Sequence, residues 1–151
     1  MLGFKRQSVD VTLTAPTTFA IAQLAAGELT AGFTVEEVEM LVDFELDITY
    51  SHTTNADPSD FTIFVDGADI APGTNGLIRH TPSAATDENT VYKKVTLRIA
   101  QGFHTAEVRA KTAANNIIVE GATVPSTITV RRHSHPATLG HGVDSKVQLV
   151  Q

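Results

Sequence analysis

The stretch VTLRIAQGFHTAEVRAKTAANNIIVEGATVPSTITVRR, residues Val95–Arg132, alternates apolar and polar residues over most of its length. A period of two places apolar side chains on one face of a β-strand. Gln101-Gly102 interrupts the alternation, and glycine supplies the positive φ that a tight turn needs. Asn115-Asn116 offers a second reversal, because asparagine tolerates the left-handed region, and Gly121 offers a third. The stretch therefore predicts a meander of four strands joined by three turns.

An even stronger alternation precedes it in Val35–Tyr50. The apolar residues occupy the even positions Val38, Met40, Val42, Phe44, Leu46, Ile48 and Tyr50. A helix would scatter these residues around its circumference, so we expect a strand from about Leu41 onward, with a helical turn left open for the segment before it. At about 3.3 Å per residue the full run would exceed about 40 Å, so we also expect a bend or bulge within it.

The remaining segments add shorter elements. Val9–Leu13 alternates like a strand, and Phe61–Val65 is an apolar strand followed by Asp66-Gly67, a strong hairpin signal. The Ala-rich segment at 17–29 fits a short helix or a pair of short strands equally well. Residues 71–90 have no sustained period, and a loop of this length in a compact domain is usually functional or interfacial.

About eight short strands with turn signals between them predict an all-β fold, an antiparallel β-sandwich of the jelly-roll-like kind with extended terminal arms. We divide the chain into an N-terminal arm or strand at 1–16, the β-sandwich domain at 17–132, and a C-terminal arm at 133–151.

Composition limits the function. The formal charge of −6 argues against a nucleic-acid groove, which needs Lys and Arg to neutralise phosphates. The absence of cysteine excludes disulfides, thiol catalysis and thiolate zinc sites. No apolar segment follows Lys5-Arg6 as it would in a signal peptide, and no stretch approaches the ~20 apolar residues of a membrane span. We therefore expect no nucleic-acid or membrane partner.

The segment from Phe44 to Val130 resembles a β-sandwich pattern of structural proteins from tailed bacteriophages, related in outline to jelly rolls of the complement-component and tumour-necrosis-factor type. The resemblance is carried by DFELDITY, FTIFVDG, Val95-Thr96-Leu97, the G-x-H-T-x-x-V-R-A run from Gly102 to Ala110, and STITV. It covers over half of the chain and implies a virion structural module, usually trimeric, without a catalytic motif.

One cluster of histidines suggests a metal site. His133 and His135 alternate in an extended segment with His141 nearby, so two imidazoles can share one ion. Ordinary surface or interface contacts are the alternative. Asp57, Asp60, Asp66 and Asp69 surround a loop and a hairpin, as calcium ligands do, but their spacing fits no known calcium loop and turn formation accounts for them.

The acidic residues Glu37, Glu39, Asp43, Glu45 and Asp47 form a stripe that is either a solvated sheet face or an interface. In the second reading it meets Arg131-Arg132 or Lys5-Arg6 of another subunit. Val147 and Leu149 lie in a last segment that can add a strand to a neighbour. His104 lies beside Thr105, but no Ser or Asp stands at the spacing of a triad.

The residues predict a non-enzymatic protein without a cofactor, and the resemblance implies a structural protein that is a homotrimer located in a phage virion. Its expected partners are other virion proteins such as the major capsid or tail proteins, and its expected role is capsid decoration or a head fibre. The alternative is a tail or receptor-binding module that recognises carbohydrate, although aromatic platforms are few because the chain has no Trp and only Tyr50 and Tyr92.

Overall fold

The computed structural model describes residues 1–21, 29–54, 57–84 and 86–134, and none of these residues lies in a helix. The strands are β1 (Gly3–Arg6), β2 (Val11–Leu13), β3 (Ala20–Ile21), β4 (Thr30–His52), β5 (Ser59–Val65), β6 (Ala68–Asp69), β7 (Ile78–His80), β8 (Asn89–Thr112), β9 (Ile117–Val119) and β10 (Thr127–Arg132). All pairings between them are antiparallel. Within the described ranges there is no helix long and apolar enough to cross a membrane.

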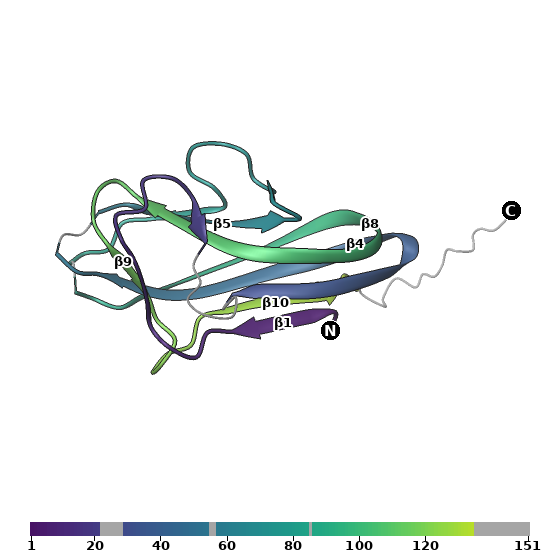
Figure 1. The fold of residues 1–151 in the computed structure, drawn as a ribbon, viewed down its shortest axis with the longest axis horizontal. Coiled ribbons are helices and arrows are strands. Elements are labelled where there is room, and N and C mark those ends of the chain that lie inside the picture. The colour runs from purple at the N-terminus through teal and green to yellow at the C-terminus, as the bar shows by residue number, and fades with distance from the viewer. Residues whose placement is uncertain (22–28, 55–56, 85, 135–151) are drawn as a thin grey trace, which may run out of the picture.

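Two long strands, β4 and β8, pair along most of their length and turn over together at one end of the molecule (right in Figure 1). The pairing register shifts between Val35 and Glu39, where residues 36–38 of β4 face only one residue of β8. Gly102 lies at the same corner with φ 142°, a backbone conformation that favours glycine. A bulge in one strand and a glycine in the other therefore let the ribbon fold back on itself.

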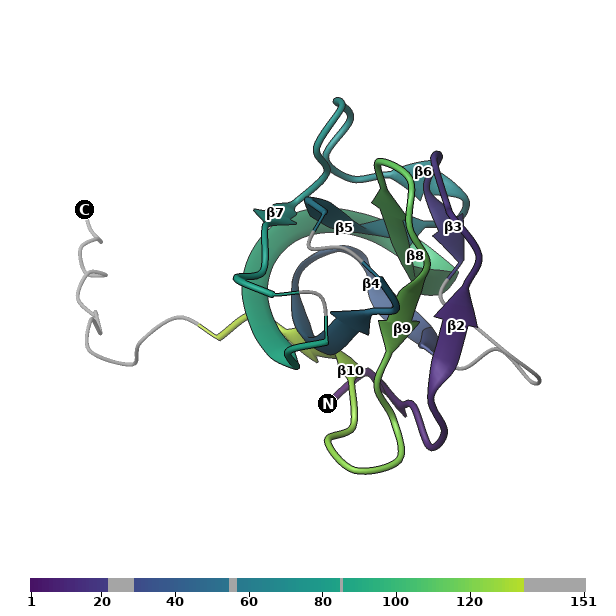
Figure 2. The same cartoon turned by 90° about the vertical axis from the view of Figure 1, so that its left-hand side faces the viewer.

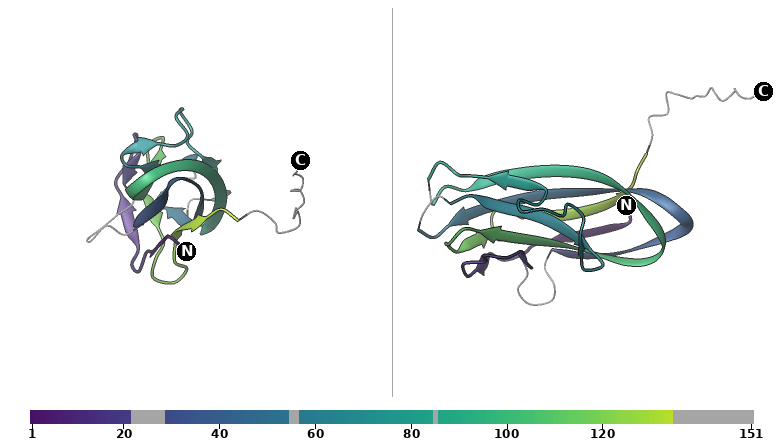
Figure 3. Two further views of the ribbon diagram at one scale, coloured as in Figure 1. Left: turned by 90° about the vertical axis from the view of Figure 1, so that its right-hand side faces the viewer. Right: turned by 90° about the horizontal axis from the view of Figure 1, so that it is seen from above.

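This corner divides the strands into two layers, which Figure 3 shows from above. One layer has the order β1, β10, the second half of β4 and the first half of β8, with β9 and β2 continuing beside β4. The other layer has the first half of β4, the second half of β8, then β5 with β6 and β7. Viewed along its length, the molecule has a rounded cross-section (Figure 2). The predicted all-β antiparallel sandwich is confirmed.

The core lies between the layers. Even-numbered side chains of the second half of β4 point inward and are buried: Met40, Val42, Phe44, Leu46, Ile48 and Tyr50. Phe44 meets Phe33 of the opposite layer edge-to-face, with ring centroids 5.7 Å apart. Tyr50 meets Phe61 of β5 at 4.9 Å. Aromatic contacts of this kind bury large apolar areas and fix the spacing of the layers.

The structure decides one open alternative and corrects two predictions. The segment before Leu41, for which a helical turn was left open, is strand. Val38 is 83% exposed although it belongs to the even-numbered apolar set, because it lies in the bulge where strict alternation is interrupted. Gln101-Gly102 is not a turn between two neighbouring strands, since β8 is continuous through it and changes layer there. The expected bend in the Val35–Tyr50 run is confirmed by the register shift.

Local turn chemistry was predicted correctly at Asp66-Gly67, where both residues have positive φ (51° and 83°) and join β5 to β6. In the Ala-rich segment, Ala20–Ile21 is a strand, and residues 22–28 lie outside the described ranges. At the N-terminus β1 pairs with β10 and β2 pairs with β9, so residues 3–13 contribute to the sheet of their own chain.

Candidate functional site

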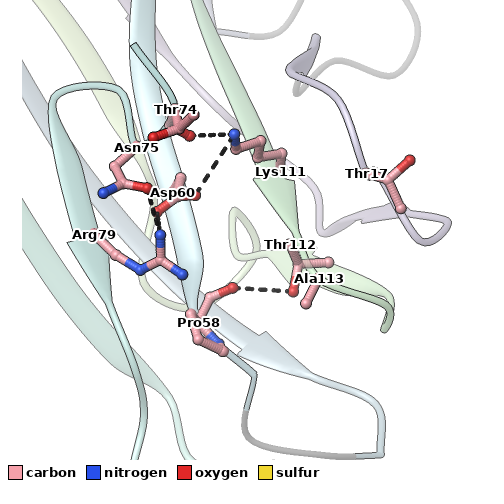
Figure 4. A pocket seen from close by; sticks show the side chains of 9 residues that line it. All are labelled: Thr17, Pro58, Asp60, Thr74, Asn75, Arg79, Lys111, Thr112 and Ala113. Carbon is pink, nitrogen blue, oxygen red and sulfur yellow. Dashed lines mark hydrogen bonds and ion pairs between the residues drawn. The ribbon is translucent and has the colours of Figure 1, made fainter.

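A cleft of about 350 Å³ lies on the outer face of the layer that contains β5, β7 and the end of β8. Figure 4 shows the residues that line it: Thr17, Pro58, Asp60, Thr74, Asn75, Arg79, Lys111, Thr112 and Ala113. Its volume is in the range of small-molecule sites in proteins. The lining is dominated by hydroxyl, amide and charged side chains, so the cleft suits a polar ligand.

Strand register brings the charged residues of the cleft together. Asp60 of β5 stands opposite Arg79 of β7 and opposite Lys111 of β8. These three residues are separated by long stretches of sequence, yet they occupy one row of the sheet. Because directly opposite side chains in antiparallel strands project from the same face, all three meet on the outer surface of this layer.

Asp60 is the buried centre of the cleft, with a side chain only 6% exposed. Its Oδ1 lies 3.7 Å from Nη1 of Arg79 and its Oδ2 lies 3.9 Å from Nζ of Lys111, distances of ion pairs but not of hydrogen bonds. No described residue donates a hydrogen bond to Oδ1. Burial raises the pKa of the Asp60 carboxyl, and the charges of Arg79 and Lys111 oppose this rise.

Each cation is held by a second partner from the loop that precedes β7. Nη1 of Arg79 donates to Oδ1 of Asn75, and Nζ of Lys111 donates to the carbonyl oxygen of Thr74. Nζ of Lys111 also lies 4.7 Å from the ring centroid of Phe19. Each cation is therefore held by one hydrogen bond to this loop and by an ion pair with Asp60.

The loop can sit this close to β5 because of one glycine. Gly76 has φ +62°, and a Cβ there would lie 2.9 Å from the carbonyl oxygen of Phe61 and 2.9 Å from Cβ of Thr62. Only glycine satisfies both the backbone conformation and the close approach. On the other side of the cleft, the Thr112 hydroxyl donates to the carbonyl oxygen of Pro58 at 3.2 Å and ties the ends of β8 and the loop before β5 together.

The predicted acidic stripe lies on the other layer, and four of its five residues, all but Asp47, are paired with other described residues of the chain. Glu37 binds Arg132 at 2.7 Å, Glu39 binds Arg98 at 3.0 Å, and Glu45 binds Arg131 at 2.7 Å. Thus Arg131 and Arg132, which the interface interpretation placed opposite the stripe of another subunit, lie opposite the stripe of their own chain. A role of these residues at an interface stays a prediction.

Asp43 is the most strongly bound residue of the stripe. It is 4% exposed and accepts hydrogen bonds from Nζ of Lys94 at 2.9 Å, the Thr96 hydroxyl at 2.6 Å and Nδ1 of His133 at 2.8 Å. Burial acts to raise the pKa of Asp43, but the bonds from Lys94, Thr96 and His133 outweigh it and lower this pKa to about 2.

The metal prediction stays untested. His133 is engaged with Asp43, whereas His135, His141, Val147 and Leu149 lie outside the described residues. Across the part of the chain that the structure describes, no three His, Cys, Asp or Glu side chains gather as metal ligands.

The four aspartates of the calcium interpretation serve separate purposes. Asp57 accepts from Asn115, and Asp69 accepts from the Thr62 hydroxyl at 2.6 Å and from the Ala71 amide at 3.0 Å. Asp66 binds His104 at 2.7 Å, and Asp60 belongs to the cleft.

Sequence reasoning singled out Asp60 and the loop at 71–90, but it missed Arg79 and Lys111. The sequence contained only indirect signs of these two residues. Lys111 falls on the polar positions of the alternation in β8, and Arg79 is a cation between Ile78 and His80 in an otherwise uncharged part of the loop. Only the register of β5 with β7 and β8 reveals that both cations face Asp60.

Comparison with known proteins does not identify a family. No protein-family model and no curated protein matches the sequence. Similar solved structures include the C-terminal domain of EclA, described as a sugar-binding protein (12% identity, 82% of this chain and 78% of that chain, TM-score 0.43). A family 35 carbohydrate-binding module from an environmental isolate is 18% identical over 90% of this chain and 95% of that chain, with a TM-score of 0.38. Eiger TNF from S. frugiperda is 12% identical over 90% of this chain and 96% of that chain, with a TM-score of 0.47. These values are too low to assign a family or a function.

Proposed function

We propose that the chain is a non-catalytic binding module that holds a saccharide by its hydroxyl groups in the cleft between β5, β7 and β8. Saccharides present many hydroxyl groups that both donate and accept hydrogen bonds. The cleft offers a matching set: a carboxylate acceptor in Asp60, donors in Arg79 and Lys111, and the amide and hydroxyl groups of Asn75 and its neighbours.

The observation that carries the proposal is that Oδ1 of Asp60 is buried and accepts no hydrogen bond from the described residues. A buried carboxylate oxygen without a hydrogen bond is costly, and native structures rarely leave one so. Oδ1 has no donor among the described residues, and the cations beside it stand beyond hydrogen-bond distance. A ligand hydroxyl that enters the cleft would supply the missing donor.

Binding without catalysis is proposed because of the chemistry of the lining. Glycoside hydrolysis typically uses two carboxyl groups on opposite sides of the scissile bond. Among the nine residues that line the cleft, Asp60 is the single carboxylate, and its ion pairs with Arg79 and Lys111 suit it to holding a ligand.

A glycan-array screen followed by calorimetric titration tests this proposal. We expect Asp60→Asn to weaken the affinity for the best glycan at least about tenfold, because the amide presents only one acceptor oxygen and no charge. The matched control is Asp47→Asn, which changes an exposed carboxylate on the other layer and should leave the affinity unchanged. A protein that binds no glycan, or an Asp60→Asn variant that binds as tightly as wild type, contradicts the proposal.

A second candidate is the virion role implied by the resemblance, in which the chain is a trimeric decoration, fibre or tail subunit bound to copies of itself and to other virion proteins. It is favoured by apolar side chains exposed where β4 and β8 turn over: Val38 is 83% exposed and Phe103 is 69% exposed. Exposed apolar side chains mark contacts between proteins where they form a contiguous patch.

Light scattering and cryo-electron microscopy of whole particles test this second candidate. It predicts a trimer whose stability falls in a Val38→Ser, Phe103→Ser variant, and density for the chain on purified particles. A stable monomer that is absent from particles contradicts it.

A further inference from the structure

The guanidinium of Arg79 has one edge that the protein does not use. Its Nη1 is engaged with Asn75 and Asp60, while Nε and Nη2 donate to no described residue. The side chain is 50% exposed. Figure 4 shows this edge turned away from Asn75, toward the Pro58 side of the cleft. Nε and Nη2 form a planar fork that matches the two oxygens of a carboxylate.

The charge of the cleft is opposite in sign to that of the whole chain. Its lining contains two cations, Arg79 and Lys111, and one carboxylate, Asp60. The chain as a whole carries a formal charge of −6. A cationic spot on an acidic surface, partly shielded from water, attracts an anion while the rest of the surface repels it.

The fork is also preorganised. Arg79 is held by its hydrogen bond to Asn75 and by the ion pair with Asp60 at 3.7 Å, which reduces the side-chain freedom to be lost when a ligand binds. None of the nine lining residues is aromatic, so stacking on a sugar ring contributes little here. Orientation must then come from charged and hydrogen-bonding groups.

From these observations we propose that the ligand of the cleft carries a carboxylate, and that it is an acidic saccharide whose carboxylate is bound by Nε and Nη2 of Arg79. This inference rests on the proposed function and names the ligand class of the same site. Asp60 takes a hydroxyl donor of the ligand, and Arg79 takes its carboxylate. Lys111, held by Thr74, adds positive charge at the far side of the cleft.

The test compares carboxylate-bearing and neutral ligands on the intact protein. A glycan array that carries uronic-acid and sialic-acid glycans beside neutral ones identifies the ligands. Titrations then use glucuronic acid, its methyl ester and inorganic phosphate. We expect binding of the acidic glycans and of glucuronic acid, and affinity for the methyl ester at least about tenfold weaker, since esterification removes the charge.

Two variants separate the fork from simple charge. Arg79→Lys keeps the positive charge but loses the planar fork, and we expect it to weaken binding of the acidic ligand about tenfold or more. Arg98→Gln removes an exposed cation whose partner, Glu39, belongs to the other layer, and should leave binding unchanged. Both positions are at least half exposed, so thermal unfolding should confirm that both variants fold.

The outcomes are distinguishable. Equal binding of glucuronic acid and its methyl ester, or of acidic and neutral glycans, overturns the inference and leaves the proposed function standing. Phosphate that binds as tightly as the acidic glycans overturns it as well, because the cleft is then a general anion site. An Arg79→Lys variant with wild-type affinity would show that the planar fork of Arg79 does not take part in recognition, and this too overturns the inference. No binding to any glycan overturns the proposed function and the inference together.

Discussion

Nδ1 of His104 lies 2.7 Å from Oδ2 of Asp66, and Nε2 of the same ring lies 3.0 Å from the carbonyl oxygen of Ala100. Both ring nitrogens therefore face acceptors, which is the arrangement of a protonated imidazolium. The Asp66 side chain also accepts from the Thr105 amide at 2.8 Å. The ring connects the hairpin turn after β5 with the part of β8 just before its corner.

This pair predicts a pH optimum for stability. The bond to Asp66 raises the pKa of His104, against the opposing effect of burial, and the bond to Ala100 adds to the rise. The contribution of His104 is complete below its unfolded pKa of about 6.5 and is lost as pH rises through the folded pKa. Burial acts to raise the pKa of Asp66, but the bonds from His104 and Thr105 lower it, so its contribution is lost as pH falls through the folded value.

We therefore expect the pair to stabilise the fold most between about pH 4 and 6.5. In that window His104→Gln should lower the free energy of unfolding by only about 1 kcal/mol, because Asp66 is half exposed and the pair is screened by solvent. At pH 9 the loss should be smaller, because the imidazole is then neutral in the wild type as well. Urea unfolding at several pH values measures this. A loss in His104→Gln that does not change with pH would show that the ring acts by packing alone.

A second prediction concerns Asp43 and acid. Its pKa of about 2 lies below the ordinary value of 3.8, so the stability that it provides is present above pH 4 and is lost as pH falls toward 2. Asp43→Asn should be less stable than wild type at pH 7, and the difference should shrink toward pH 2. Thermal unfolding between pH 2 and pH 7 checks this, with Asp47→Asn as the exposed control. Parallel stability curves for Asp43→Asn and wild type would contradict it.

The corner of the ribbon makes a third prediction. Gly102 has φ 142°, which a side chain tolerates poorly, and Gly102→Ala should cost on the order of 1–3 kcal/mol in the free energy of unfolding. Gly67→Asn is the control, because its φ of 83° lies in a hairpin turn where asparagine is tolerated and a Cβ would meet nothing within 4 Å. We expect only a small change there. Equal losses would argue that the corner does not depend on glycine.

A fourth prediction concerns the aromatic contact between the two layers. Phe44 is fully buried against Phe33, so Phe44→Ala should lower the free energy of unfolding by about 3–5 kcal/mol. Phe4→Ala removes the same side chain from a position that is 51% exposed and should cost far less. Denaturant unfolding compares the two. Similar losses would mean that the sandwich is not held by its interlayer aromatics.

What the sequence predicts well is the content of each strand. Alternation along β4 places Phe44 and Ile48 in the core, because a period of two is a property of the local backbone. The Asp66-Gly67 turn follows from local chemistry in the same way. Val38 and Gly102 were misplaced because alternation does not show where a strand crosses from one layer to the other.

The cleft could not be predicted from local sequence patterns, because its residues come from separate strands. Asp60, Arg79 and Lys111 become neighbours only through the pairing of β5 with β7 and β8. None of the three residues belongs to a local motif, and the loop that fixes the cations contributes a backbone carbonyl and an amide. A site assembled by register between separate strands leaves no spacing signature in the sequence.

The pairing of β1 with β10 has a consequence for how the protein is made. Gly3 stands opposite Val130, so β1 cannot pair with β10 until nearly all of the described residues have been synthesised. Until then the strand edge that β10 later covers is open to other chains. We expect nascent chains stalled before residue 127 to leave the pairing edge of β1 uncovered, and synthesis of Thr127–Arg132 to cover it.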